Sequence, residues 1–176
     1  MGSDKIHHHH HHMYRIRVFG DPVLRKRAKP VTKFDENLKK TIERMIETMY
    51  HYDGVGLAAP QVGISQRFFV MDVGNGPVAV INPEILEIDP ETEVAEEGCL
   101  SFPEIFVEIE RSKRIKVKYQ NTRGEYVEEE LEGYAARVFQ HEFDHLNGVL
   151  IIDRISPAKR LLLRKKLMDI ARTVKR

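Results

Sequence analysis

The sequence predicts an α+β fold, in which mostly antiparallel strands pack around a buried central helix that carries a His-Glu-x-x-His motif. An N-terminal helix and a C-terminal helix complete the expected fold. Three observations support this prediction: apolar residues at helical spacing in residues 34–49, short β-branched runs separated by turn residues in 68–131, and helical patterns after residue 133. Because the strands follow one another between helices, this order favours α+β over alternating βαβ units.

The chain is expected to hold one domain. Residues 1–12 contain six consecutive histidines and are interpreted as an expression tag. The other 164 residues (176 − 12) are enough for one domain with a proper core. Residues 13–176 show no repeat, low-complexity linker or break in composition, so we expect a single domain there.

The first helix is predicted from an apolar stripe, which consists of Phe34, Leu38, Ile42, Met45, Ile46 and Met49. Either Thr32 or Asp35 can cap its start, and Asp53-Gly54 is expected to end it. Strands are then expected over residues 68–73, 78–81, 85–88, 106–109, 115–119 and 126–131. The turns between them are predicted at residues 75–76, 82–83 and 123–124.

The central helix is expected over residues 134–146 and should stop at Asn147-Gly148. Its predicted apolar face consists of Tyr134, Ala135, Val138 and Leu146. The last helix should open at Ser156-Pro157, a suitable cap and first-position pair. It would place six residues where they could pack inward: Leu161, Leu162, Leu167, Met168, Ala171 and Val174.

The composition indicates a cytoplasmic protein. A single cysteine excludes an intrachain disulfide, and no signal peptide or membrane-length apolar run follows Met13. We therefore expect no membrane association. The net charge of +1 gives no reason to expect a specific DNA partner.

The charge is unevenly distributed along the chain. Residues 84–132 hold 15 acidic and 6 basic side chains, a net of −9, whereas residues 157–176 hold 8 basic and 1 acidic, a net of +7. The basic C-terminal helix suggests a transient contact with ribosomal RNA. The alternative is a solvated surface helix.

The motif at His141, Glu142 and His145 is the strongest chemical signal. Histidines four residues apart lie on one face of a helix, so both imidazoles can reach one divalent metal ion. Glu142 would then lie beside a metal-bound water, from which it could take a proton. Outside the tag the sequence has three histidines, and two of them stand in this motif.

Cys99 is the candidate for the third metal ligand. A lone cysteine is usually an inert buried residue, but this one follows Glu97 and Gly98, which suits a tight backbone better than a core strand. Two histidines and one cysteine with an open fourth position form a known catalytic ligand set. A glycine-rich segment at residues 54–63 allows close approach of a ligand, and its Gln61 offers an amide donor; the alternative there is a simple turn.

Three segments of the chain resemble the signature motifs of peptide deformylases, in the same order and with compatible spacing. They are Gly-Val-Gly-Leu-Ala-Ala-Pro-Gln at 54–61, Glu-Gly-Cys-Leu-Ser at 97–101 and Gln-His-Glu-Phe-Asp-His-Leu at 140–146. The resemblance extends from residue 13 to about residue 156. It implies an enzyme that removes the formyl group from N-formylmethionyl nascent peptides and releases formate.

The resemblance also implies roles for individual residues. Cys99, His141 and His145 would bind the metal, and Glu142 would transfer the proton of the attacking water to the departing amine. The side-chain amide of Gln61 and the backbone N–H of Leu100 would stabilise the oxyanion. The residues implied in substrate binding are Val55, Gly56, Glu97, Gly98, Tyr134, Arg137 and Val138.

The identity of the metal is a point of conflict. A thiolate with two imidazoles would by softness favour zinc. The resemblance instead implies Fe(2+), one per chain, which nickel, cobalt or zinc can replace in preparations. We expect iron for activity.

Two other classes of function remain open. A zinc endopeptidase would normally take its third ligand from a downstream His or Glu, and this chain has no histidine after His145. A non-catalytic metal sensor should have a closed site with four protein ligands, and the sequence shows no evident fourth unless Glu142 itself binds.

Overall fold

The computed structural model describes residues 13–174. The α-helices are α2 (Glu36–His51), α3 (Gly133–Leu146), α4 (Pro157–Leu162) and α5 (Arg164–Arg172). The strands are β1 (Gly56–Ala58), β2 (Phe68–Met71), β3 (Val78–Ile88), β4 (Thr92–Cys99), β5 (Phe102–Ser112), β6 (Arg114–Gln120) and β7 (Tyr126–Glu132). Three 3-10 helices are η1 (Pro22–Arg25), η2 (Ala59–Val62) and η3 (Ile151–Arg154).

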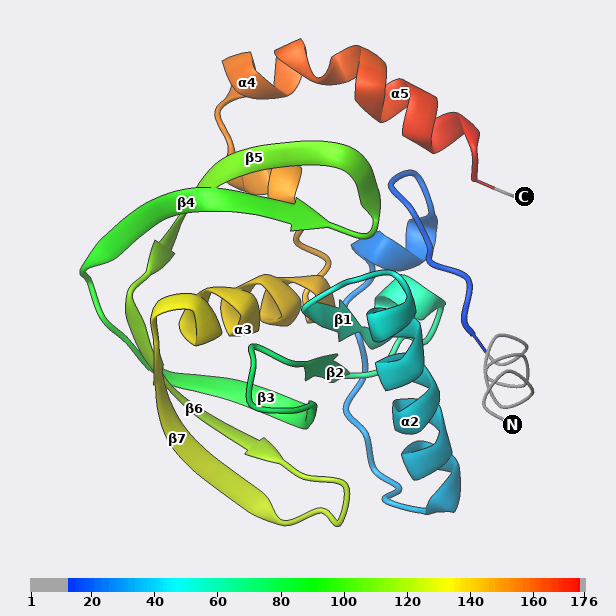
Figure 1. Ribbon diagram of the computed structural model, residues 1–176, viewed down its shortest axis with the longest axis vertical. Helices are drawn as coiled ribbons and strands as arrows, with labels where there is room; N and C mark the ends of the chain where they lie inside the picture. The colour runs from blue at the N-terminus through cyan, green and yellow to red at the C-terminus, as the bar shows by residue number, and fades with distance from the viewer. Residues whose placement is uncertain (1–12, 175–176) are drawn as a thin grey trace.

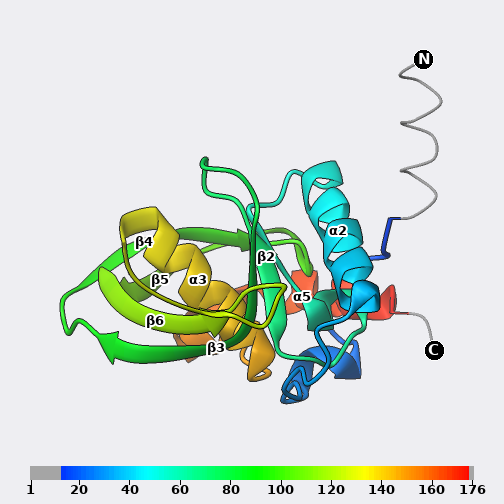
Figure 2. The ribbon, with the colours of Figure 1, turned by 90° about the horizontal axis from the view of Figure 1, so that it is seen from below.

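Two antiparallel sheets lie on either side of α3 (Figure 1). One sheet has five strands in the order β1-β2-β3-β6-β7, and the other consists of β4 and β5. The β4–β5 hairpin crosses α3 on the side opposite the five-stranded sheet, while α4 and α5 lie beyond β5 (Figure 1). Figure 2 shows α2 beside β2. The predicted α+β class, with antiparallel strands around a central helix, is confirmed.

The central helix α3 begins directly where β7 ends. Gly133 takes a φ of 61° at this junction, which glycine adopts without steric cost. The helix buries Ala136, Val138 and Phe139, and the Phe139 ring meets Phe69 of β2 edge to face, with ring centroids 5.1 Å apart. The helix is therefore fixed against the large sheet, and its predicted range of 134–146 agrees with the structure to within one residue.

Helix α2 follows the prediction closely. The Asp35 side chain caps it by accepting a hydrogen bond from the Leu38 N–H at 3.0 Å, so Asp35 rather than Thr32 is the cap. Asp53 follows the helix with a φ of 56° and leads into Gly54. This reversal delivers the chain to β1 and η2, which carry the glycine-rich segment.

The strand predictions need three corrections. Strands β1 and β4 were not predicted, and Cys99 is the last residue of β4 rather than part of a tight non-strand segment. Strand β5 begins at Phe102, four residues before the predicted start. The expected turn at Asn82 is wrong, because β3 continues through it with a shift in register. Asn82 has a φ of 52°, and its side chain bonds both the N–H and the carbonyl of Val31.

The expected inward packing of the C-terminal helix is confirmed in part, because Ala171 and Val174 are half-buried beside Gly20. The helix is divided into α4 and α5, and none of the residues 157–162 of α4 is buried. Leu161, Leu162 and Met168 are exposed, whereas Leu167 is buried. Tyr134, predicted on the apolar face of α3, is also 56% exposed, because the first turn of the helix projects beyond the core.

Within residues 13–174, no helix has both the length and the apolar character needed to cross a membrane.

Candidate functional site

The site forms where the β4–β5 hairpin packs on α3: Cys99 of β4 lies beside His141 and His145 of α3. Their potential ligand atoms are all within 4.8 Å of one another. Donors bound to one ion at about 2.0–2.3 Å stand roughly 3.3–3.7 Å apart, and the 3.4 Å between Cys99 Sγ and His145 Nε2 already matches that spacing. A thiol and two imidazoles in this arrangement are suitable ligands for one divalent ion.

Glu97 orients His141 from the hairpin. Its Oε1 accepts the Nδ1 hydrogen of His141 at 2.9 Å, which leaves Nε2 of that ring free for another contact. A carboxylate that fixes the ring of a metal-binding histidine in this way is a common arrangement around metal ions. Although burial raises the pKa of Glu97, hydrogen bonds from Arg111 and His141 lower it far below its usual value. Glu97 is therefore a buried anion at neutral pH.

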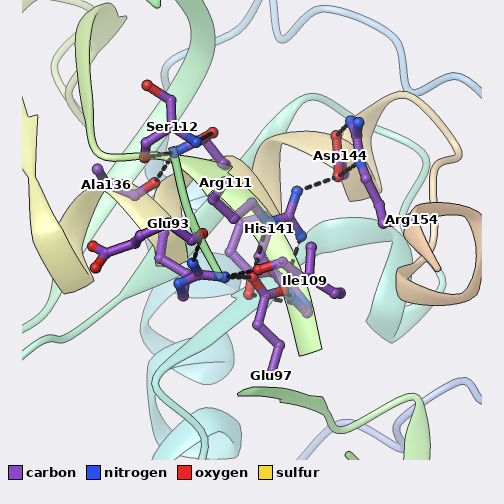
Figure 3. Close-up of polar contacts among 12 residues, drawn as sticks. Glu93, Glu97, Ile109, Arg111, Ser112, Ala136, His141, Asp144 and Arg154 are labelled. Atoms are coloured by element: carbon purple, nitrogen blue, oxygen red, sulfur yellow. Dashed lines mark hydrogen bonds and ion pairs between the residues drawn. The ribbon is translucent and has the colours of Figure 1, made fainter. Parts of the chain in front are cut away.

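A buried network of ion pairs holds Glu97 in place (Figure 3). Arg111 donates to both Glu97 oxygens, at 2.8 and 2.9 Å, and its Nη1 donates to Asp144 at 2.7 Å. Arg154 donates to Asp144 from η3, at 2.8 and 3.0 Å. The network connects the hairpin, α3 and η3, so Glu97 and Asp144 are each held by contacts with another element.

Arg137 belongs to the same network. Its Nη1 donates to Glu97 Oε2 at 2.7 Å and to the Ile109 carbonyl at 2.8 Å, and its Nη2 donates to the Glu93 carbonyl at 2.8 Å. The resemblance implied a role for Arg137 in substrate binding. In the structure its guanidinium is buried and supports Glu97, so a charged residue is accommodated beside the pocket.

The two histidines differ in their electrostatic surroundings. Burial lowers the pKa of His141, but hydrogen bonds with Cys99 and Glu97 outweigh it and raise the pKa well above its usual value. Burial lowers the pKa of His145 well below its usual value. The position between Cys99 and Glu97 therefore attracts a positive charge, which a metal ion would supply in place of the proton.

Glu142 faces the same space from α3. It is 4% exposed, and burial raises its pKa to about 7. Its Oε1 has no hydrogen-bond partner within residues 13–174. Gly56 leaves room for the other oxygen, because a Cβ on Gly56 would lie 2.5 Å from Glu142 Oε2. The carboxyl group can exchange a proton near neutral pH and has an oxygen available to a water or a substrate.

The Gln61 side chain is held at both ends. Its Oε1 accepts from the Ala58 N–H at 2.9 Å, while its Nε2 donates to Ser101 Oγ at 3.1 Å and lies 3.5 Å from Cys99 Sγ. The Ser101 hydroxyl donates in turn to the Arg17 carbonyl at 2.7 Å. These contacts aim an amide N–H at the space beside the thiol.

One pocket of about 720 Å³ collects nearly all of the predicted site residues. His145 is 1% exposed and lies outside the pocket lining. The other predicted residues line the pocket: Val55, Gly56, Gln61, Glu97, Gly98, Cys99, Leu100, Tyr134, Arg137, Val138, His141 and Glu142. Cys99 and His141 thus line a space large enough for a peptide end, and the buried His145 lies next to them.

The sequence interpretation missed Ser101, Arg111, Asp144 and Arg154. A signal for Arg111 exists in the alternation of β5, because Ile105, Val107 and Ile109 are buried and Arg111 continues the same face. An arginine at a buried strand position requires a carboxylate partner. The pattern alone does not say which one.

Comparison with known proteins agrees with this geometry. The family model for polypeptide deformylase matches residues 13–161. A peptide deformylase from Thermotoga sp. (strain RQ2) is 99% identical over 164 residues, which is 93% of this chain and 100% of that protein. A peptide deformylase from Fusobacterium nucleatum is 47% identical over 167 residues and covers 93% of this chain and 96% of its own length.

Solved structures give the same result. A peptide deformylase from Thermus thermophilus has a TM-score of 0.86 at 44% identity, with 91% of this chain and 98% of that chain covered. One from Synechococcus elongatus, in complex with actinonin, has a TM-score of 0.83 at 42% identity, with 87% and 85% covered. Fold, sequence and pocket thus agree over most of the chain, which belongs to the polypeptide deformylase family.

Proposed function

We propose that this chain hydrolyses the formyl amide of N-terminal formylmethionine on newly synthesised peptides, with a metal ion held by Cys99, His141 and His145. The observation that carries the proposal is the convergence of these three donors and Glu142 in one pocket, in a chain that matches the deformylase family. The substrate also supports a cytoplasmic location, because the formylated end is present on nascent chains.

The donor set fits a divalent ion, which when bound lowers the pKa of water and polarises a carbonyl group. Ferrous iron is our proposal for the active ion, with nickel, cobalt and zinc as replacements that the same donors can hold. Glu97 contributes by fixing the ring of His141, so that Nε2 is presented in one orientation.

Glu142 carries the proton in the proposed reaction. Its carboxylate takes a proton as water adds to the formyl carbon, and gives that proton to the amine nitrogen when the C–N bond breaks. The products are formate and a free methionyl N-terminus. The raised pKa of about 7 suits a group that must accept and release a proton in one cycle.

Gln61 and Leu100 are the proposed oxyanion donors. Gln61 Nε2 is pre-positioned beside Cys99 by its contacts with Ala58 and Ser101, so it needs no reorientation during the reaction. Leu100 follows Cys99 directly and lines the same pocket, so its backbone N–H is near the reacting centre.

The remaining pocket residues are proposed to hold the peptide. Val55, which precedes β1, and Gly56, which opens it, line the pocket together with Gly98 of β4. An extended peptide between them could pair with backbone as an added strand. Tyr134 and Val138 are proposed to enclose the methionine side chain.

The experiment is formate release from formyl-Met-Ala-Ser by protein purified anaerobically, with metal analysis of the same sample. Unformylated Met-Ala-Ser is the control substrate. Glu142→Ala should keep its metal and lose about two to four orders of magnitude in rate. A metal-loaded wild-type chain that releases no formate would contradict the proposal.

The same experiment separates the two rival functions. Cleavage of the unformylated peptide would indicate an endopeptidase. Metal binding without any hydrolysis would indicate a sensor, although a pocket that opens onto Cys99 and His141 does not suit the closed four-ligand site of a sensor.

We also propose that α4 and α5 contact the ribosome. Leu161 and Leu162 are 67% and 80% exposed, and exposed basic residues accompany them. Salt-sensitive co-sedimentation with ribosomes is expected, because phosphate contacts weaken as salt rises. The double variant Lys165→Glu with Lys166→Glu should abolish this co-sedimentation without disturbing the buried Leu167. If the variant co-sediments as well as the wild type, the proposed ribosome contact is wrong.

A further inference from the structure

Phe106 is an exposed aromatic residue on an otherwise acidic strand face. Alternation in the middle of β5 buries Ile105, Val107 and Ile109 and turns residues 104, 106, 108 and 110 outward. The outward neighbours of Phe106 are carboxylates, at Glu104 and Glu108, whereas the Phe106 side chain is 62% exposed. The large apolar ring is therefore flanked along its own strand by carboxylates on both sides.

The Phe106 ring lies over the backbone of Gly98. The two residues are opposite one another in the β4–β5 register. A Cβ added to Gly98 would lie 2.8 Å from Phe106 Cε1 and 2.9 Å from Cδ1, so the ring occupies the space that a side chain at residue 98 would need. Cys99 is the next residue of β4. The ring is therefore one residue removed from the proposed metal ligand.

Phe106 also stands where two hollows meet. It lines the pocket that contains Cys99, His141 and Glu142, and it lines a second hollow of about 500 Å³ beside the hairpin. Glu96 is the other residue common to both linings. A chain leaving the first pocket towards the second hollow passes these two residues.

We propose that Phe106 is a specificity-determining residue, whose ring receives an apolar side chain from the second or third residue of the formylated peptide. The inference rests on the proposed function and adds a preference beyond formylmethionine. Successive residues of an extended peptide are about 3.3 Å apart, so a ring next to Cys99 is within reach of these two positions. Glu96 and Glu104 line the pocket beside the ring and oppose an acidic side chain there.

The test measures kcat/KM for two peptide series, formyl-Met-Xaa-Ser and formyl-Met-Ala-Xaa, with Xaa as Leu, Phe, Ala or Asp. The readout is the ratio of kcat/KM for Leu to kcat/KM for Asp, which is independent of the amount of active enzyme. The wild-type ratio should be about ten at one of the two positions. A tenfold ratio corresponds to about 1.4 kcal/mol, which burial of roughly 55 Å² of apolar surface would supply.

Two variants at residue 106 and one control complete the design. Phe106→Ala should reduce the ratio to about threefold or less, and Phe106→Lys should invert it in favour of Asp. Tyr126→Ala is the matched control, because Tyr126 is a similarly exposed aromatic (67%) on β7 and lines neither hollow. The control should keep the wild-type ratio.

The outcomes separate this inference from the proposed function. Formate release with equal Leu and Asp rates at both positions, or a wild-type ratio in Phe106→Ala, would overturn the role of Phe106 alone. Absence of formate release from every peptide would overturn the proposed function and this inference with it.

Discussion

Replacing Glu97 with glutamine tests whether the buried network supports both the fold and the metal site. Glu97 accepts four hydrogen bonds, two from Arg111 and one each from Arg137 and His141, at 2.7–2.9 Å. Its side chain is 5% exposed, and those of Arg111 and Arg137 are 4% and 8% exposed. Glutamine keeps the shape but removes the charge and turns one acceptor into a donor.

The size of the effect follows from this burial. Removing one partner of a buried ion pair costs about 3–5 kcal/mol, and glutamine, which keeps one acceptor oxygen, should fall near the lower end. For a chain of this length that is a decrease in Tm of roughly 6–12 °C. Loss of the carboxylate that orients His141 should also weaken metal affinity about 10–100-fold.

The stability lost in the Glu97→Gln variant should depend on pH, and the direction of this dependence can be predicted. The pKa of Glu97 is lower in the folded chain than its ordinary value of 4.5, so its contribution to stability is complete above that value. The contribution is lost as pH falls below 4.5 towards the folded pKa. The stability difference between wild type and Glu97→Gln should therefore be smaller at pH 3 than at pH 7.

Urea unfolding at the two pH values and metal titration of the folded variant measure these effects. Glu96→Gln is the control, because Glu96 is the exposed neighbour of Glu97 on the same strand and should change stability by less than about 0.5 kcal/mol. If Glu97→Gln unfolds at the wild-type midpoint and binds metal equally well, the reasoning about the network is wrong.

Three further predictions concern the site and its support. Gly56→Ala should displace the Glu142 carboxylate, because the new Cβ would lie 2.5 Å from Oε2; deformylation should fall about 10²-fold while the metal content measured in the same sample stays unchanged. Gln61→Ala should reduce kcat about 10²–10³-fold if its amide serves the oxyanion, and a rate within threefold of wild type would exclude that role. Burial raises the pKa of Asp153, but the hydrogen bond from Arg25 outweighs it and lowers the pKa below the ordinary 3.8, so its stabilisation is present above that pH and lost below it. Asp153→Asn should accordingly cost about 0.2–1 kcal/mol at pH 7 and less at pH 3 in urea unfolding, and an equal cost at both values would contradict the pair.

The sequence was sufficient to predict an element where one short segment contains all the residues that define it. Helix α2 has its cap at Asp35, its apolar stripe and its reversal at Asp53 within twenty residues, so its range could be predicted. The β4 strand could not, because its sequence, Thr-Glu-Val-Ala-Glu-Glu-Gly-Cys, lacks an apolar–polar alternation: its buried residue is Glu97, whereas Val94 is exposed. Its inward face is recognisable only when the partner strand β5 is known.

In the candidate site, too, local patterns predict some features and not the contacts between distant segments. The spacing of His141 and His145 on one helix follows from helical geometry, but their meeting with Cys99 required the resemblance to the family or the structure itself. The ion pairs of Arg111 with Glu97 and Asp144 join segments far apart in sequence, and no local pattern specifies such partners. For Leu161 and Leu162 the helical pattern was correct, but hydrophobicity alone does not show whether a covering surface exists.

The three candidate ligands come from two elements that become neighbours only when the hairpin packs on α3. Contacts of Arg111 with Asp144 and of Arg137 with Glu97 join the hairpin to the helix without any ion. Metallation would then follow folding instead of driving it. A shortage of the metal ion would leave a folded apoprotein that is ready to bind it, so the supply of the ion would set how quickly new chains lose their formyl groups.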